Sequence, residues 1–220
     1  MNNFSLIPIT LTGLSLLLIS CKSKDNEEAI SKTDQQQVNP DHIKPESTAP
    51  PIINSESESP SQKYHNEWLK KAQSNDSNAM FEVGSQFYDG YGCLQSDQKA
   101  FSWWLKSAKS GNYKAMNNVG ICYKNGTGVP KNLSRSVKWF TNAANKGDSF
   151  GMYNLYVAYL EGSGVKVDKE VAFEWLQKSA NLGHYDAMED MHLIYNEGGL
   201  RPKDSKKAEF WKNKLLKTER

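Results

Sequence analysis

Residues 79–111 read AMFEVGSQFYDGYGCLQSDQKAFSWWLKSAKSG, and residues 115–147 repeat the pattern as AMNNVGICYKNGTGVPKNLSRSVKWFTNAANKG. Tryptophan returns every 36 residues, at Trp103, Trp139, Trp175 and Trp211. The same interval separates two other sets: Phe87, Tyr123, Tyr159 and Tyr195, and Gly90, Gly126, Gly162 and Gly198. A period of about 34 to 40 residues with two helical stretches and glycine-rich turns is typical of a helix-turn-helix solenoid.

Each repeat unit is expected to contain two helices, here called helix A and helix B. Helix A of the first unit, over residues 78–89, places Ala79, Val83 and Phe87 on one face. The Gly-x-Gly segments that follow helix A supply positive-φ residues, which commonly end helices. Helix B then begins after one preferred N-cap residue per unit, at Ser96, Asn132, Asp168 and Asp204.

The interior of helix B predicts how the units pack. Ala100, Trp103, Trp104 and Ala108 form an apolar stripe in the first unit. Small alanines allow close helix approach, and the repeated tryptophans are expected to fill the wedge between units.

The residues of 79–111 and 115–147 resemble the Sel1-like repeat, a relative of the tetratricopeptide repeat. The resemblance covers residues 77–214 and implies an all-α fold, a right-handed α-solenoid of about four helix-turn-helix repeats with N- and C-terminal capping helices. The predicted domain is 64–220, with a capping helix at 64–74 and repeats at 77–112, 113–148, 149–184 and 185–218. Tyr156 and His192 stand where the family has glycine, and Leu200 replaces a loop glycine, so the last two helix pairs are expected to be splayed.

The N-terminus predicts an export signal. Residues 4–19 are almost continuously apolar, and the charge begins directly after Cys21. Residues 18–21 resemble the lipobox of bacterial lipoproteins, although Met1-Asn2-Asn3 carries no Lys or Arg. This resemblance implies a signal peptide at 1–20, lipidation (including palmitate) of Cys21 and a lipid-anchored place in the bacterial cell envelope, at the outer membrane, periplasmic or surface-exposed.

Residues 22–63 are expected to form a disordered tether beginning at the lipidated Cys21. The tract has five Pro and no Phe, Trp or Tyr, so it cannot bury enough apolar surface to order itself. It holds five Lys and eight Asp or Glu, which leaves residues 64–220 at net +5. That charge is too low to indicate a nucleic-acid partner.

Little in the sequence indicates catalysis. The Gly-x-Gly segments follow helices rather than strands and lack the Gly-Lys-Ser/Thr of a phosphate loop. His42, His65, His184 and His192 share no metal-ligand spacing, so no metal, cofactor or enzymatic activity is predicted. A disulfide-rich branch of the Sel1-like family is linked to cell-wall or β-lactam chemistry, but it carries a cysteine pair in every repeat. Here the domain has only Cys93 and Cys122, and whether they pair stays open.

The resemblance to tetratricopeptide-like solenoids implies that helices A line a concave groove. The off-core residues of helix A are more apolar than a solvated face requires, which favours a partner site. The predicted groove residues are Phe81, Tyr88, Ile121, Phe150, Tyr153, Val157 and Leu160.

The predicted function is therefore a membrane-tethered scaffold or adaptor that binds a protein or peptide in this groove. Three alternatives remain: an immunity protein that neutralises a secreted toxin such as a lipase effector, a cell-wall or β-lactam-acting enzyme, and a spacer of the envelope without a groove ligand. The partner, the membrane leaflet and the oligomeric state are not predicted.

Overall fold

The computed structural model describes residues 58–218, which form helices and no strand. The helices are α1 (Pro60–Gln73), α2 (Ser77–Asp89), α3 (Asp97–Lys109), α4 (Tyr113–Asn125), α5 (Leu133–Asn145), α6 (Ser149–Glu161), α7 (Lys169–Asn181), α8 (Tyr185–Glu197) and α9 (Ser205–Thr218). This confirms the all-α repeat fold. The predicted signal peptide, Cys21 and most of the predicted tether lie outside the described residues. None of the helices between residues 58 and 218 combines the length and apolar character needed to cross a bilayer.

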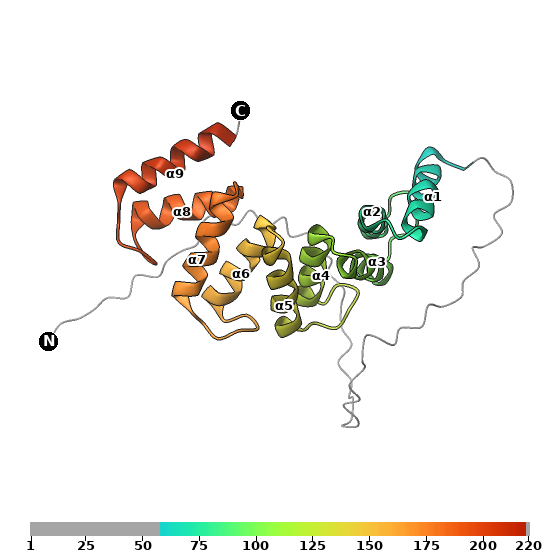
Figure 1. Cartoon of the computed structure of the whole chain (residues 1–220), viewed down its shortest axis with the longest axis horizontal. Coiled ribbons are helices and arrows are strands. Elements are labelled where there is room, and N and C mark those ends of the chain that lie inside the picture. Colours follow the sequence, from blue (N-terminus) through green and yellow to red (C-terminus); the bar gives the residue numbers. More distant parts are fainter. Residues whose placement is uncertain (1–57, 219–220) are drawn as a thin grey trace, which may run out of the picture. The chain divides into compact units, whose positions relative to one another are not determined.

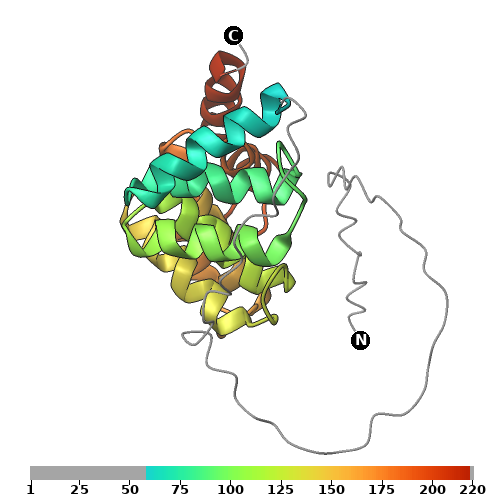
Figure 2. The ribbon, with the colours of Figure 1, turned by 90° about the vertical axis from the view of Figure 1, so that its right-hand side faces the viewer.

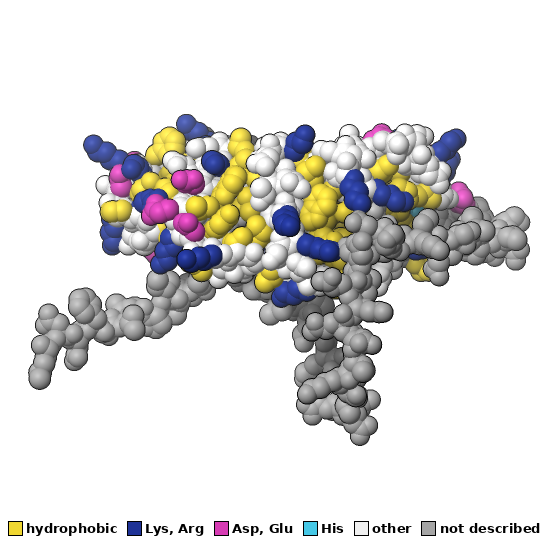
Figure 3. All heavy atoms as spheres, turned by 60° about the horizontal axis from the view of Figure 1, so that its bottom comes forward, with side chains coloured by type: hydrophobic (Ala, Val, Ile, Leu, Met, Phe, Trp, Pro, Cys, Tyr) yellow, Lys and Arg dark blue, Asp and Glu magenta, His cyan; other side chains and the backbone are white. Residues whose placement is uncertain are grey.

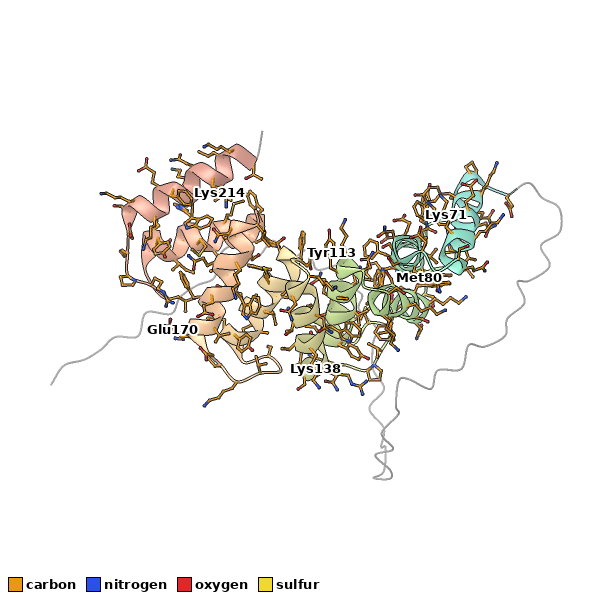
Figure 4. All side chains as sticks on the ribbon, viewed as in Figure 1. Lys71, Met80, Tyr113, Lys138, Glu170 and Lys214 are labelled. Carbon is orange, nitrogen blue, oxygen red and sulfur yellow. The ribbon has the colours of Figure 1, made fainter. Side chains whose placement is uncertain are left out.

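The helices stack in chain order, and the main contacts join helices that follow one another in the sequence. The stack forms an arc in Figure 1, with α2, α4, α6 and α8 on its inner side. Figure 2 shows the same helices lying side by side in successive layers. Tyr113 at the start of α4 and Lys138 on α5 lie on opposite sides of the stack (Figure 4). We call the surface formed by α2, α4, α6 and α8 the inner face.

Local capping signals determine where the helices begin and end. The predicted N-caps of helix B are confirmed, because the side chains of Ser96, Asn132, Asp168 and Asp204 each accept a backbone N–H of the first turn. Gly90, Gly126 and Gly162 end α2, α4 and α6 in the left-handed conformation. Helix α1 begins four residues earlier than predicted, because Ser59 and Gln62 form a capping box with Pro60 in the first turn.

The repeated tryptophans, predicted to fill the wedge between units, all pack against the buried clusters but differ in how far they are buried. Trp211 is buried, but Trp103, Trp139 and Trp175 are only half-buried. The residue after each of these three is buried instead: Trp104, Phe140 and Leu176. Successive helix residues point about 100° apart, so a shift of one residue moves the side chain from the core to its edge. Lys106 and Lys178 lie over the Trp103 and Trp175 rings, 4.3 and 4.2 Å from the ring centroids.

The residue of helix A that faces the buried side chain of helix B is small where that side chain is large. A Cβ on Gly84 would lie 2.5 Å from the Trp104 ring, and a Cβ on Gly120 would lie 2.5 Å from the Phe140 ring. In the third unit Tyr156 replaces this glycine, and the opposing position 176 holds the smaller leucine.

The predicted splaying of the last two helix pairs is not observed. Helices α6 and α7 contact each other as extensively as α4 and α5 do, and α8 and α9 nearly so. In the fourth unit the His192 ring lies against α9, with Nδ1 2.9 Å from the Ala208 carbonyl oxygen. Helix B thus accommodates the larger residue of helix A in both units. Leu176 leaves room for Tyr156, and the Ala208 carbonyl oxygen lies within hydrogen-bond distance of His192, so both helix pairs stay closed.

Candidate functional site: the inner face

The seven predicted groove residues do not form one continuous surface. Tyr88 and Phe150 are exposed by 45% and 59%. The other five are partly buried, and they pack against the core between the helices: Phe81, Ile121, Tyr153, Val157 and Leu160. The inner face therefore divides into two places where predicted residues meet accessible surface.

The first place is a pocket between the C-terminal halves of α2 and α4. Tyr88 and Ile121 line it together with Trp104, whose indole sits opposite Gly84. Its volume is about 250 Å³. The remaining lining residues are Ser85, Asp89, Asn118, Cys122, Asn125 and Thr127. We call this the α2–α4 pocket.

The second place is an aromatic cluster between α6 and α8. The His184 ring stacks on Tyr153 at a centroid distance of 4.8 Å and meets Phe150 edge-on at 4.5 Å. The Tyr153 hydroxyl donates to Asp190 Oδ2 at 3.1 Å. His184 and Asp190 were not predicted. The available signal was that His184 occupies the N-cap position held by Asp76, Asn112 and Asp148 in the other units.

Burial changes the proton affinities in this cluster. Burial lowers the pKa of His184, and the Asp186 carboxylate only partly offsets it. Nδ1 of the neutral ring is then free to accept the Ala187 N–H, 3.4 Å away. Burial also raises the pKa of Asp190 to about 6, against the opposing effect of its hydrogen bond from Tyr153. The Tyr153 pKa is raised by burial and by the charge of Asp190.

A polar contact at one repeat position connects α4 with α6 and α6 with α8. Asn154 donates to Asn117 Oδ1 at 3.0 Å between α6 and α4, and Tyr153 binds Asp190 between α6 and α8. The two residues are 37 positions apart in both bonds. At the α2–α4 step the corresponding pair is Phe81 and Asn118, and a phenyl ring cannot form this bond.

Large exposed hydrophobic side chains are distributed unevenly. Within the described part of the repeats, helices A carry Tyr88, Tyr113, Phe150, Tyr185 and Leu193, whereas α3, α5 and α7 carry none and the terminal helix α9 carries Phe210 and Leu216. Others lie on loops, including Leu94 and Val167. On the lower side of the arc, Figure 3 shows hydrophobic side chains in patches separated by basic and polar ones. The inner face is thus where exposed aromatic side chains are concentrated on helices.

The sulfur and histidine chemistry of the domain is limited. Between residues 58 and 218, no three His, Cys, Asp or Glu side chains are grouped so that they could hold a metal ion. Cys93 and Cys122 form no disulfide with each other. Burial raises the pKa of the Cys122 thiol to about 12, and the nearby Asp97 charge adds to this. A thiol that stays protonated at neutral pH is a poor nucleophile.

Comparison with known proteins identifies the repeat. The family model described as the Sel1 repeat matches residues 77–112, 114–148 and 149–184. A Sel1 repeat protein from Oxalobacter formigenes is 28% identical, with a TM-score of 0.66 over 70% of this chain and 62% of that one. The protein c5321, a protective antigen of uropathogenic Escherichia coli strains with an SLR fold, is 31% identical, with a TM-score of 0.65 over 71% of this chain.

The chain thus spans only 62% and 33% of the lengths of these two proteins. No curated protein matches it. Residues 185–218, the predicted fourth repeat, lie outside the family matches but fold as the pair α8–α9. Residues 77–184 of this chain are therefore Sel1 repeats, within an all-α repeat solenoid.

Proposed function

We propose that this chain is an interaction module that binds a segment of another protein on its inner face. Sel1 repeats mediate contacts between proteins, which supports the class of function. The observation that carries the proposal is the concentration of exposed aromatic side chains on α2, α4, α6 and α8, with none on α3, α5 and α7. Tyrosine is enriched among the residues that dominate binding energy in protein interfaces, and phenylalanine is enriched at interface cores.

The test is affinity capture from envelope extracts of the source bacterium with the full chain as bait. The inner-face variant is Phe150→Ser with Tyr113→Ser, which removes two exposed aromatic rings. The matched control is Leu94→Ser with Val167→Ser, which removes exposed apolar side chains from the loops. We expect the wild type and the loop control to retain the same partner and the inner-face variant to lose it. Capture by all three proteins, each with native circular dichroism, would place the partner elsewhere.

We further propose that a lipid on Cys21 tethers the module to the cell envelope. The support is the sequence of residues 18–21 after an apolar stretch, which lies outside the described residues. Cys21→Ser should abolish incorporation of labelled palmitate and release the protein from the membrane fraction. A variant that stays with the membrane would contradict lipid anchoring without affecting the proposal for the inner face.

A further inference from the structure

The α2–α4 pocket has an apolar floor. The Trp104 indole donates its N–H to the Phe81 carbonyl oxygen at 3.2 Å, so its polar edge is already satisfied. The Tyr88 ring covers one side, with its centroid 5.5 Å from that of Trp104. Ile121 and the buried Cys122 complete the floor from α4. An occupant would therefore meet mainly carbon and sulfur atoms at the bottom of the pocket.

The size of the pocket selects the kind of occupant. Sites for drug-sized molecules typically measure about 300–1,000 Å³. At about 250 Å³, the α2–α4 pocket lies below that range and is suited to a single bulky side chain. A side chain presented by a polypeptide fits this volume, and the rest of the polypeptide would lie along the inner face.

The one charged residue in the lining of the pocket is acidic. Asp89 is the only charged residue of the lining, and it forms no ion pair with the other described residues. It is also the last residue of α2, and Asn125 is the last residue of α4. The C-terminal end of a helix carries a partial negative charge, so two helix ends and one carboxylate meet at this rim. A cationic group next to the apolar side chain would be favoured.

The rim also holds amide groups without a protein partner. Asn154 and Asp190 bond to the preceding A helix, but for the equivalent Asn118 the corresponding residue of the preceding helix is Phe81, which cannot accept or donate such a bond. Among residues 58–218, the side chains of Asn118 and Asn125 form no hydrogen bond. A carboxamide both donates and accepts, as the peptide group does, so these side chains can bond to the main chain of an extended segment.

We propose that the α2–α4 pocket binds one bulky apolar side chain of an extended peptide segment, and that Asp89 selects a Lys or Arg beside that side chain. This rests on the proposed function, because the segment belongs to the protein bound on the inner face. It adds the chemistry of the recognised sequence, which is an aliphatic or aromatic residue next to a basic one.

The probe is a phage-displayed library of random 12-residue peptides selected on the immobilised full chain. The enriched peptides should share a Leu, Ile, Met or Phe adjacent to a Lys or Arg. A fluorescein-labelled copy of the best peptide then gives the dissociation constant by anisotropy. Ile121→Ala and Asp89→Asn should each weaken its binding about tenfold, because the first removes an apolar contact on the pocket floor and the second removes the carboxylate that pairs with the basic residue.

Helix α7, which is not part of the inner face, provides matched controls. Leu182 is exposed just past the end of α7, Glu174 is exposed on α7, and neither residue lines this pocket. Leu182→Ala and Glu174→Gln should leave the dissociation constant within about twofold of the wild type. Asp89→Asn should also abolish the preference for Lys or Arg when the selection is repeated on that variant.

Several outcomes would overturn the pocket assignment. These are a selection without binders, enriched peptides that lack the apolar–basic pair, and binding that Ile121→Ala and Asp89→Asn leave unchanged. Capture of the same envelope partner by wild type and both pocket variants would leave the proposed function standing and reject this pocket. Loss of capture only in the Phe150→Ser/Tyr113→Ser variant would likewise reject the pocket while supporting the inner face as the binding surface.

Discussion

We expect Phe140 to contribute more to stability than Trp139, the repeated tryptophan beside it. Its ring is 2% exposed and fills the space that Gly120 leaves open. Phe140→Ala should lower the free energy of unfolding by about 3–5 kcal/mol, because it removes a buried ring and leaves a cavity. Trp139→Ala should cost clearly less, since the indole is only half-buried. Urea denaturation of the two variants measures both losses, and equal or reversed values would contradict this assignment of the core.

His184 makes stability sensitive to acid. Because burial lowers its pKa from the ordinary value of 6.5, the unfolded chain binds the proton more readily than the folded one. Stability from this residue is therefore present above about pH 6.5 and is lost as the pH falls toward the lowered pKa. Protonation also removes the Nδ1 acceptor that caps α8.

His184→Asn should remove this loss, because Asn112 caps α4 at the equivalent position and does not titrate. Relative to the wild type, the variant should gain about 1 kcal/mol between pH 7.5 and pH 5, the usual value of an N-cap. Asp190 has the opposite effect in both proteins. Because its pKa is raised from the ordinary 3.8 to about 6, acidification between these two pH values favours the folded state. This contribution of Asp190 is the same in the wild type and the variant, so it cancels when their stabilities are compared. A difference in melting temperature that stays constant with pH would refute the role of His184.

The features that the sequence did not predict share a physical cause. The 36-residue period identifies equivalent positions, but it does not say which of two adjacent large residues faces the core. Trp103 and Trp104 are both apolar and lie about 100° apart on the helix, so their roles depend on the neighbouring helix. His184 and Asp190 meet through Tyr153 of another helix. That contact has no local signature.

Pairs of helices are held together by side chains of complementary size. Gly84 with Trp104 and Gly120 with Phe140 place the large residue on helix B, whereas Tyr156 with Leu176 shares the volume more evenly. Tyr156→Gly alone should leave a cavity, and Leu176→Phe alone should overpack the core. The double variant recreates the pair found in the second unit. It should be more stable than the sum of the single effects by about 0.5–3 kcal/mol, the usual range of coupling between contacting residues.

A double-mutant cycle by chemical denaturation gives this coupling energy. The intrinsic cost of glycine within a helix appears in both Tyr156→Gly proteins and therefore cancels. Strictly additive losses would show that the two positions do not exchange volume. The combination Tyr156→Gly with Leu182→Phe is a suitable control, because Leu182 is exposed beyond the end of α7.

The elements themselves could be predicted well because their signals are local. N-cap side chains such as Asn132 and C-terminal glycines such as Gly126 act within one turn of their own helix. The inner face was less predictable, since its exposure depends on how successive units curve. Tyr88 and Phe150 stay exposed, but Val157 and Leu160, which were also predicted to line the groove, are partly buried and pack against the core.

The described domain behaves as a one-dimensional stack, because each helix contacts mainly its neighbours in the chain. Its buried residues form three clusters along the stack, and the contact between α7 and α8 is the smallest of those joining successive helices. In such stacks, stability is a sum of unit and interface terms, and a weak interface allows a terminal unit to open alone. We therefore expect the pair α8–α9 to open before α2–α7.

Arg201 supports this interface from the loop between α8 and α9. Its guanidinium forms a bidentate pair with Glu170 of α7, at 3.1 and 2.6 Å, and lies 4.0 Å from the Phe173 ring centroid. Native-state hydrogen exchange should show a lower opening free energy for amides of α8 and α9 than for those of α4 and α5. Arg201→Ala should lower it by about 1 kcal/mol further, because the variant loses both the ion pair and the contact with the Phe173 ring. As a control, Lys203→Ala removes a nearby exposed cation and should leave the opening free energy of α8 and α9 unchanged. Equal opening free energies along the whole stack would show instead that the domain opens as one unit.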